Sequence, residues 1–197
     1  MAYEFKIAIL VGSTRSGSIN ECLARAIERV APKTLGFYRV SMEEMPFYDA
    51  DLEGNRPQSV KAFVDAISRA DAVCIVTPEY NRSIPAILKN AIDWASKPTG
   101  ASVWREKIIA TCGTSPGAIG TAIGQQHLRQ ILASIGAYVL PGDTFISFNS
   151  PNMIDIDGKI ANENVHEIVK NFTIRFEKFI SLLSNPGSGS RDEVRQA

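Results

Sequence analysis

Short apolar runs in this chain alternate with longer segments in which apolar residues recur every three or four positions. Several of these runs are almost continuously apolar, which is typical of strands covered on both faces of a parallel sheet. The predicted strands are 6–11, 36–40, 71–77, 107–111 and 138–140, to which 145–148 can add.

The segments between these runs have the periodicity of amphipathic helices. The predicted helices are 19–31, 57–67, 85–95, 119–135 and 165–183. Pro32 closes the first of them, and Pro57 and Pro85 stand where a first turn tolerates proline. Residues 42–57 are expected to be irregular.

Regular alternation of strands and helices predicts an α/β fold built on a parallel sheet. Five such units in fewer than about 190 residues favour a flavodoxin-like three-layer sandwich with strand order 2-1-3-4-5 over a six-stranded dinucleotide fold. We expect one domain over residues 1–184. Residues 185–197 are rich in Gly and Ser and then charged, so we expect a disordered tail.

The charge balance and the lengths of the apolar runs argue against several classes of protein. The 21 basic and 21 acidic residues cancel and form no basic stripe, which argues against nucleic acid as a partner. No apolar run approaches the roughly 20 residues that span a bilayer, and the N-terminus lacks the pattern of a signal peptide. We therefore expect a cytoplasmic protein that does not enter a membrane.

Cysteine and histidine give no sign of a metal site in the sequence. Cys22, Cys74 and Cys112 are odd in number, have no C-x-x-C spacing and stand in apolar segments, where cysteine usually serves as a small core residue. His127 lacks a carboxylate or cysteine partner at a recognisable spacing, so we expect a packing or interface role. The chain has two histidines in all.

The candidate site is expected at one edge of the sheet. In doubly wound sheets, ligands bind beyond the carboxyl ends of the strands, where the strand order reverses. The loops at that edge are 12–20, 77–85 and 112–120, and all three are rich in glycine, hydroxyl groups or proline.

The first loop, GSTRSGSIN, has neither the G-x-G-x-x-G pattern nor the Walker lysine. Clustered hydroxyl groups at a helix start, together with Arg15, suit a single terminal phosphate. The alternative is that the serines merely cap the helix.

The second loop places Tyr80 and Asn81 at a strand end, where backbone groups can line the edge of a flat ring. The alternative is a turn in which Asn81 or Ser83 caps the next helix and Tyr80 packs on the surface. Trp94 and Trp104 flank the end of that helix, and either a pocket wall or an oligomer contact would suit them.

The third loop contains G-T-S-P-G, which matches the G-x-S-x-G nucleophile elbow. Asp155 or Asp157 and then His166 follow in the order of a hydrolase triad. Pro116 argues against this function, because the residue after the nucleophile must donate an N–H to the oxyanion and proline has none. We place His166 on a solvated face and expect the loop to contact a ligand edge.

Two of these segments carry a family resemblance. GSTRSGSIN at 12–20 and PEYNRSIPAILKNAIDW at 78–94 resemble the NADPH-dependent FMN reductase family, and especially its bacterial quinone and chromate reductases. The likeness extends from about residue 6 to residue 183.

The resemblance implies FMN as cofactor, NADPH or NADH as electron donor, and no catalytic side chain or metal. It places one group of residues around the FMN phosphate and ribityl chain, and two groups around the ring. The phosphate group is Ser13, Thr14, Arg15, Ser18, Ile19 and Asn20. The ring groups are Pro78, Glu79, Tyr80 and Asn81, with Ser115 and Gly117 at the pyrimidine end.

The implied activity is a ping-pong transfer of electrons from NAD(P)H to a small acceptor. Quinones, azo and nitro compounds, chromate and free flavin all qualify. The family also implies a homo-oligomer, either dimer or tetramer, in which the helix from Pro85 and residues 125–129 pack across an interface.

The sequence departs from related quinone reductases at several positions. Arg82 replaces a common aromatic residue, and an arginine and a tyrosine are missing near Ile123 and Gln126. These departures bear on the acceptor and on tetramer contacts, and Arg82 would suit an anionic substrate or the phosphates of the nicotinamide donor. The rival function is a flavodoxin-type electron carrier, but such carriers typically steer their partners with a strong acidic field, which a formal charge of zero does not provide.

Overall fold

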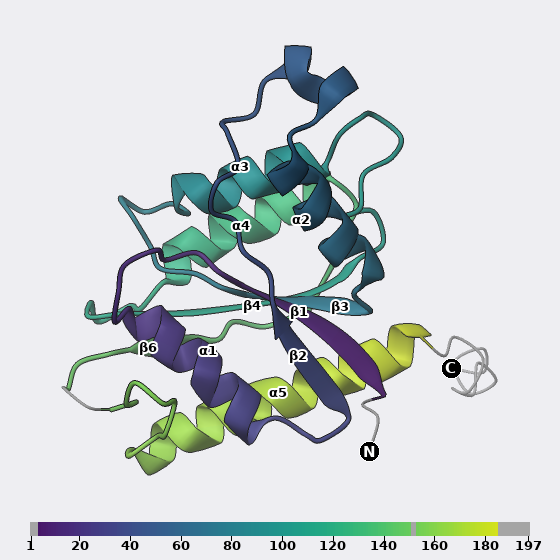
Figure 1. Cartoon of the computed structure of the whole chain (residues 1–197). Coiled ribbons are helices and arrows are strands. Elements are labelled where there is room, and N and C mark those ends of the chain that lie inside the picture. The colour runs from purple at the N-terminus through teal and green to yellow at the C-terminus, as the bar shows by residue number, and fades with distance from the viewer. Residues whose placement is uncertain (1–3, 151–152, 185–197) are drawn as a thin grey trace, which may run out of the picture.

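A computed structural model of the chain, describing residues 4–150 and 153–184, shows a parallel sheet between two layers of helices (Figure 1). The strand order β2-β1-β3-β4-β5 confirms the predicted doubly wound arrangement. The strands are β1 (Phe5–Val11), β2 (Leu35–Arg39), β3 (Ala72–Val76), β4 (Ile108–Ser115), β5 (Tyr138–Val139) and β6 (Phe145–Ser147).

Both segments expected at the fifth position of the sheet form strands, and each pairs with a different part of β4. Two short strands share this position, with β5 beside the start of β4 and β6 beside its end. The pairings Ile108↔Tyr138 and Gly113↔Phe145 mark the two positions. Pro141 interrupts the ladder because it has no N–H to donate, and Gly142 turns the chain with a φ of 82°.

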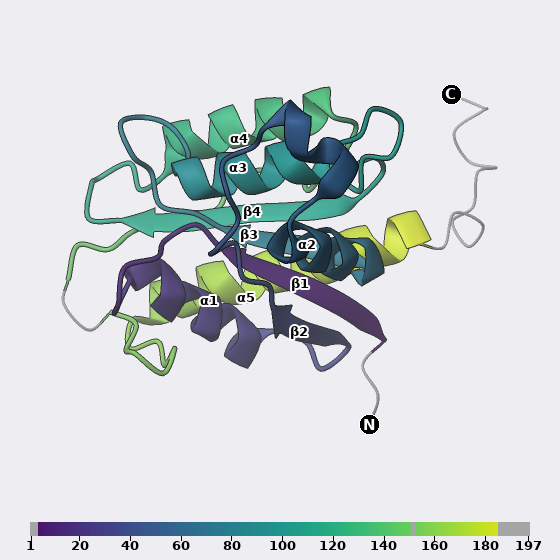
Figure 2. The same cartoon turned by 45° about the horizontal axis from the view of Figure 1, so that its top comes forward.

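Helices cover both faces of the sheet, and Figure 2 shows the two layers edge-on. The helices are α1 (Ile19–Val30), α2 (Gln58–Arg69), α3 (Ala86–Ala95), α4 (Ala122–Ser134) and α5 (Glu163–Ser184). A 3-10 helix, η1 (Ala50–Asn55), lies within the segment expected to be irregular.

The core is divided by the alternation of side chains along each central strand. In β1, Ile7 and Ile9 pack in the cluster that contains residues of α1 and α5. Ala8 and Leu10 pack in the opposite cluster, which contains residues of α2, α3 and α4. The continuously apolar run that predicted this strand therefore reflects burial on both faces.

Trp94 and Trp104 are both fully buried. Trp94 Nε1 donates to the carbonyl oxygen of Pro46 at 2.8 Å, and Trp104 Nε1 donates to that of Ile92 at 3.0 Å. Each indole thus has the polar partner that a buried tryptophan needs. The expectation that these rings wall a pocket or contact another subunit is wrong, because neither ring is exposed.

The sequence also led us to expect no membrane-spanning segment and a disordered C-terminal tail. Among the described residues, no helix combines the length and apolar character required to cross a membrane. The disorder expected for residues 185–197 falls on a segment outside the described residues.

The three cysteines are buried, as expected of core residues. Burial raises the pKa of the Cys22 thiol and raises that of Cys112 further above its usual value. A raised pKa keeps a thiol protonated, and the protonated form is a poor nucleophile.

We therefore expect Ellman's reagent at pH 8 to label none of the cysteines in the native protein within minutes. In guanidinium chloride all three should react at once. Rapid labelling of one thiol before unfolding would contradict the burial described here.

Candidate functional site

The three loops predicted to form the site meet at the carboxyl edge of the sheet. A Cβ added at Gly12 would lie 3.1 Å from Thr77 Oγ1 and 3.3 Å from Pro85 Cγ, so the first loop touches the second. A Cβ added at Gly113 would lie 2.1 Å from the carbonyl oxygen of Thr77. Glycine at these two positions thus lets the ends of β1, β3 and β4 approach one another closely.

Asn20 ties the start of α1 to the end of β4. Its Nδ2 donates to the carbonyl oxygen of Thr114 at 2.9 Å, and the Thr114 N–H donates to Asn20 Oδ1 at 3.0 Å. The side chain is buried and both ends of its amide are used. Direct contact between Asn20 and a ligand stays a prediction, and the structure adds a supporting role that the sequence did not indicate.

The first loop leaves several backbone donors without a partner. Ser18 is the N-cap of α1, and its Oγ accepts from Asn20 N at 3.2 Å. The capping alternative thus holds for this serine. The backbone N–H groups of residues 13–17 donate to no acceptor in the described parts of the chain. Free amides at the start of a helix, beside exposed hydroxyl groups and Arg15, form a cradle suited to an anion.

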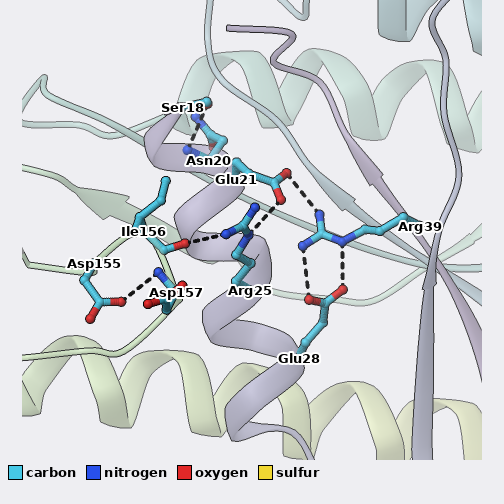
Figure 3. Close-up of polar contacts among 9 residues, drawn as sticks. All are labelled: Ser18, Asn20, Glu21, Arg25, Glu28, Arg39, Asp155, Ile156 and Asp157. Carbon is cyan, nitrogen blue, oxygen red and sulfur yellow. Dashed lines mark hydrogen bonds and ion pairs between the residues drawn. The ribbon is translucent and has the colours of Figure 1, made fainter. Parts of the chain in front are cut away.

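An ion-pair network that begins beside this cradle extends along α1 and includes Arg39 at the end of β2 (Figure 3). The Glu21 carboxylate pairs with Arg25 and with Arg39, both at 3.2 Å. Arg39 also pairs with Glu28 at 2.8 Å. Glu21 lines a hollow of ≈ 290 Å³ together with Ser13 and other residues. The two arginines offset a negative charge that would otherwise oppose an anion at the helix start.

The second loop is a tight hairpin turn. The Tyr80 and Ser83 backbone groups bond each other in both directions at 2.9 Å, and φ is 51° at Asn81 and 64° at Arg82. Positive φ at both central residues is the signature of a type I′ turn. The N-cap of α3 is Pro85, with no side-chain cap. In the alternative interpretation of this loop, the cap by Asn81 or Ser83 is therefore wrong, because the turn closes before the helix begins. The turn itself and the exposed Tyr80 agree with that alternative.

Glu79 fixes this turn to α4. Its side chain is 7% exposed, Oε2 accepts from Gly124 N at 2.8 Å, and Oε1 accepts from Arg82 Nη1 at 3.2 Å. The Thr121 N-cap of α4 provides no side-chain cap, so Glu79 satisfies a first-turn amide in its place. Ser83 Oγ and His127 Nδ1 form a second link at 2.8 Å, which gives His127 a packing role.

The third loop is held together by Ser115. Its hydroxyl donates to the carbonyl oxygen of Gly120 at 2.6 Å and accepts from Gly117 N at 3.2 Å. Asp155 accepts instead from the backbone of Asp157 at 3.0 Å within its own turn, and His166 lies in the first turns of α5. Ser115 and Asp155 therefore each bond within their own turn, and neither contacts His166 in the described part of the chain.

His166 belongs to a group that the sequence did not indicate. It gathers with Glu163 and Glu167 so that one ligand atom from each lies within 4.8 Å of the others. The group is on α5, and its helical spacing alone accounts for the proximity. Exposed acidic groups of this kind are common without an ion, and the group takes no part in the three loops.

The geometry suits a ligand with an anion at one end and a planar ring at the other. Free amides at residues 13–17 offer donors to the anion. Exposed apolar side chains stand on or next to the other two loops: Tyr80 on the turn, Ile119 in the third loop and Ile123 in the first turn of α4. FMN has both parts, so the residues present fit this cofactor.

Comparisons with known proteins agree with this fit. A family model for NADPH-dependent FMN reductase matches residues 5–151. A 2-hydroxy-1,4-benzoquinone reductase from Burkholderia sp is 41% identical over 175 residues, covering 89% of this chain and 96% of the relative. A quinone reductase from Escherichia coli K12 is 36% identical over 185 residues, covering 91% and 97%.

Solved structures show the same architecture. FerB, a flavoenzyme NAD(P)H:(acceptor) oxidoreductase from Paracoccus denitrificans, superposes with a TM-score of 0.85 at 35% identity, covering 90% of this chain and 97% of FerB. A mutant flavodoxin from Pseudomonas aeruginosa matches with a TM-score of 0.56 at 16% identity, covering 87% of this chain and 99% of the flavodoxin, which shows the fold alone.

The close approach between Gly113 and Thr77 predicts that Gly113→Ala strongly lowers the stability of the protein. The added methyl group would meet the backbone of Thr77, so a strand must shift, at a cost of about 1–3 kcal/mol in the free energy of unfolding. Gly54→Ala is the matched control, because a Cβ there has no neighbour within 4 Å. Urea unfolding of the two variants measures the difference, and equal stabilities would contradict the contact.

Proposed function

Because the chain belongs to the NADPH-dependent FMN reductase family, we propose that it passes electrons from NAD(P)H to quinones in a ping-pong cycle. It is an FMN-dependent, NAD(P)H-dependent oxidoreductase. The observation that carries the proposal is the convergence at one edge of the sheet of the free-amide cradle of residues 13–17 with the loops that follow β3 and β4. The balanced reaction consumes NAD(P)H, one proton and the quinone, and yields NAD(P)⁺ and the hydroquinone.

The residues that would hold the cofactor divide between its two ends. At the phosphate and ribityl end are Ser13, Thr14, Arg15, Ser18, Ile19 and Asn20, and Asn20 acts there through its bonds to Thr114. At the ring are Pro78, Glu79, Tyr80 and Asn81 on one side, and Ser115 and Gly117 on the other.

Bound FMN would supply the redox chemistry, a two-electron transfer between donor and acceptor. The chain supplies position and electrostatics. Ser115 Oγ accepts from the Gly117 N–H at 3.2 Å, so a hydrogen bond within the loop fixes the backbone that would border the ring. Glu79 is occupied by Gly124 and Arg82, so we assign it a positioning role and no proton transfer.

Quinones are the acceptors that we propose first, because relatives at 36–41% identity are named for quinone reduction. Azo and nitro compounds, chromate and free flavin are further acceptors that the same cycle can serve. An electron carrier remains the rival function, and it would need a protein partner to reduce any of them.

We further propose that the chain works as a homo-oligomer, a dimer or tetramer, in the cytoplasm, where NAD(P)H is available. Within residues 125–129, Gln125 and Leu128 are buried in their own chain, so they do not take part in such an interface. Ile119 and Ile123 are 43% and 42% exposed, and they offer apolar contacts on the neighbouring turns.

We expect Arg15 to contribute more to the affinity for FMN than to the stability of the fold. The wild-type protein is expected to be yellow, with one FMN per chain. Arg15→Ala should raise the dissociation constant of the apoprotein for FMN about tenfold or more, because a charge-assisted hydrogen bond is lost. Fluorescence titration of FMN measures the constant, and thermal unfolding should be nearly unchanged.

Arg29→Ala is the matched control for Arg15→Ala. Arg29 is exposed like Arg15 but lies in the last turn of α1, at the opposite end from the cradle. Equal weakening by both variants, or a colourless protein that cannot be reconstituted, would argue against the phosphate site.

Steady-state kinetics should distinguish the proposed cycle from its alternatives. With 1,4-naphthoquinone as acceptor, double-reciprocal plots at several NADPH or NADH concentrations should give parallel lines, because the donor product leaves before the acceptor enters. Lines that converge would contradict the ping-pong order. Turnover that appears only with an added redox protein would support the carrier.

A further inference from the structure

Arg82 occupies a turn position that is normally given to glycine. In the type I′ turn from Tyr80 to Ser83, φ is 51° at Asn81 and 64° at Arg82. Asparagine suits the first central position, but a long side chain at the second crowds the backbone and costs conformational energy. Strain of this kind persists where the surrounding structure enforces it and the side chain has a use.

A nearly buried carboxylate orients the Arg82 guanidinium. Glu79 Oε1 accepts from Arg82 Nη1 at 3.2 Å, and the Glu79 side chain is 7% exposed. Glu79 Oε2 accepts from Gly124 N at 2.8 Å, in the first turn of α4. Because the helix start offsets part of the Glu79 charge, positive potential remains at Arg82.

The guanidinium is open to a ligand at the rim of the site. The Arg82 side chain is 65% exposed, so the donors that do not face Glu79 are accessible. Tyr80, two residues earlier on the same turn, is 51% exposed and offers a flat ring. Through Glu79 the turn is fixed to α4, which follows the loop of Ser115 and Gly117. An exposed guanidinium on the same turn as an exposed aromatic side chain suits a planar anion.

We propose that Arg82 makes planar, negatively charged quinones the preferred acceptors by binding their anionic substituent. The inference rests on the proposed quinone reductase activity and adds the acceptor class to it. The quinone takes up two electrons and two protons, as a hydride equivalent from NAD(P)H and a proton from solvent. The anionic substituent is unchanged, so Arg82 acts in binding and transfers neither electron nor proton.

The test compares two acceptors that differ by one permanent charge, 1,4-naphthoquinone-2-sulfonate and 1,4-naphthoquinone. Arg82→Gln keeps a hydrogen-bonding side chain and removes the charge. It should lower kcat/KM for the sulfonate about tenfold or more, mainly through KM. The value for the neutral quinone should change by less than about twofold, since it makes no charged contact.

A binding measurement gives a second readout that needs no turnover. Naphthalene-2-sulfonate cannot be reduced, and calorimetry on the holoprotein should show binding weakened about tenfold or more by Arg82→Gln. Arg69→Gln is the matched control in both experiments. Arg69 is 72% exposed, pairs with Asp65 at 2.6 Å and lies at the end of α2, so its loss changes net charge equally without touching the turn.

The phosphates of NAD(P)H are also negatively charged and could bind Arg82 in place of the acceptor. A third experiment therefore measures the rate at which NADPH and NADH reduce the holoprotein. Anaerobic reduction of the holoprotein by NADPH and by NADH should be unchanged in Arg82→Gln. Slower reduction with either donor, equal losses with both quinones, or equal effects of Arg69→Gln would overturn the inference. Failure of the wild-type protein to reduce the neutral quinone would overturn the proposed function, while sulfonate binding would still decide the role of Arg82.

Discussion

The close packing of β3 against β4 at their carboxyl ends is the constraint on which the candidate site depends. No side chain fits between the strands at Gly113, where a Cβ would lie 2.1 Å from the Thr77 carbonyl oxygen. Gly12 permits a similar approach between the first loop and Pro85, although at 3.3 Å it is less severe. Because the strand ends meet so closely, the loops that follow them share one edge and can contact a single ligand.

Buried polar side chains hold those loops in place. Asn20 joins α1 to β4, and Glu79 joins the turn after β3 to α4. Gln125 extends the same pattern, donating to Thr121 Oγ1 and to the Thr144 carbonyl oxygen, both at 2.9 Å. Loops carry many backbone donors and acceptors that must be satisfied when buried, so polar side chains suit these contacts better than apolar ones. The backbone N–H groups of residues 13–17 differ from these contacts, because no acceptor in the described part of the chain hydrogen-bonds to them.

Charge in this protein is arranged locally, with a formal net charge of zero. Glu21 is offset by Arg25 and Arg39, beside the first loop. Glu79 is offset by Arg82 and by the start of α4. Such pairs act over a few ångströms, since salt screens exposed charges beyond about 10 Å. The charged groups of these two pairs therefore act through short-range contacts.

The sequence by itself determined the order of strands and helices, the parallel sheet and the three loops of the site. Apolar periodicity and the placement of prolines are local signals, because they depend only on residues that are close together in the sequence. Pro116 excluded a serine nucleophile elbow for the same reason, because a missing N–H is a property of the residue itself. Only the tertiary structure decided the partners of Asn20 and Glu79, which lie 94 and 45 residues away. It also buried Trp94 and Trp104 and placed β5 and β6 beside opposite ends of β4, because those outcomes depend on which surfaces meet.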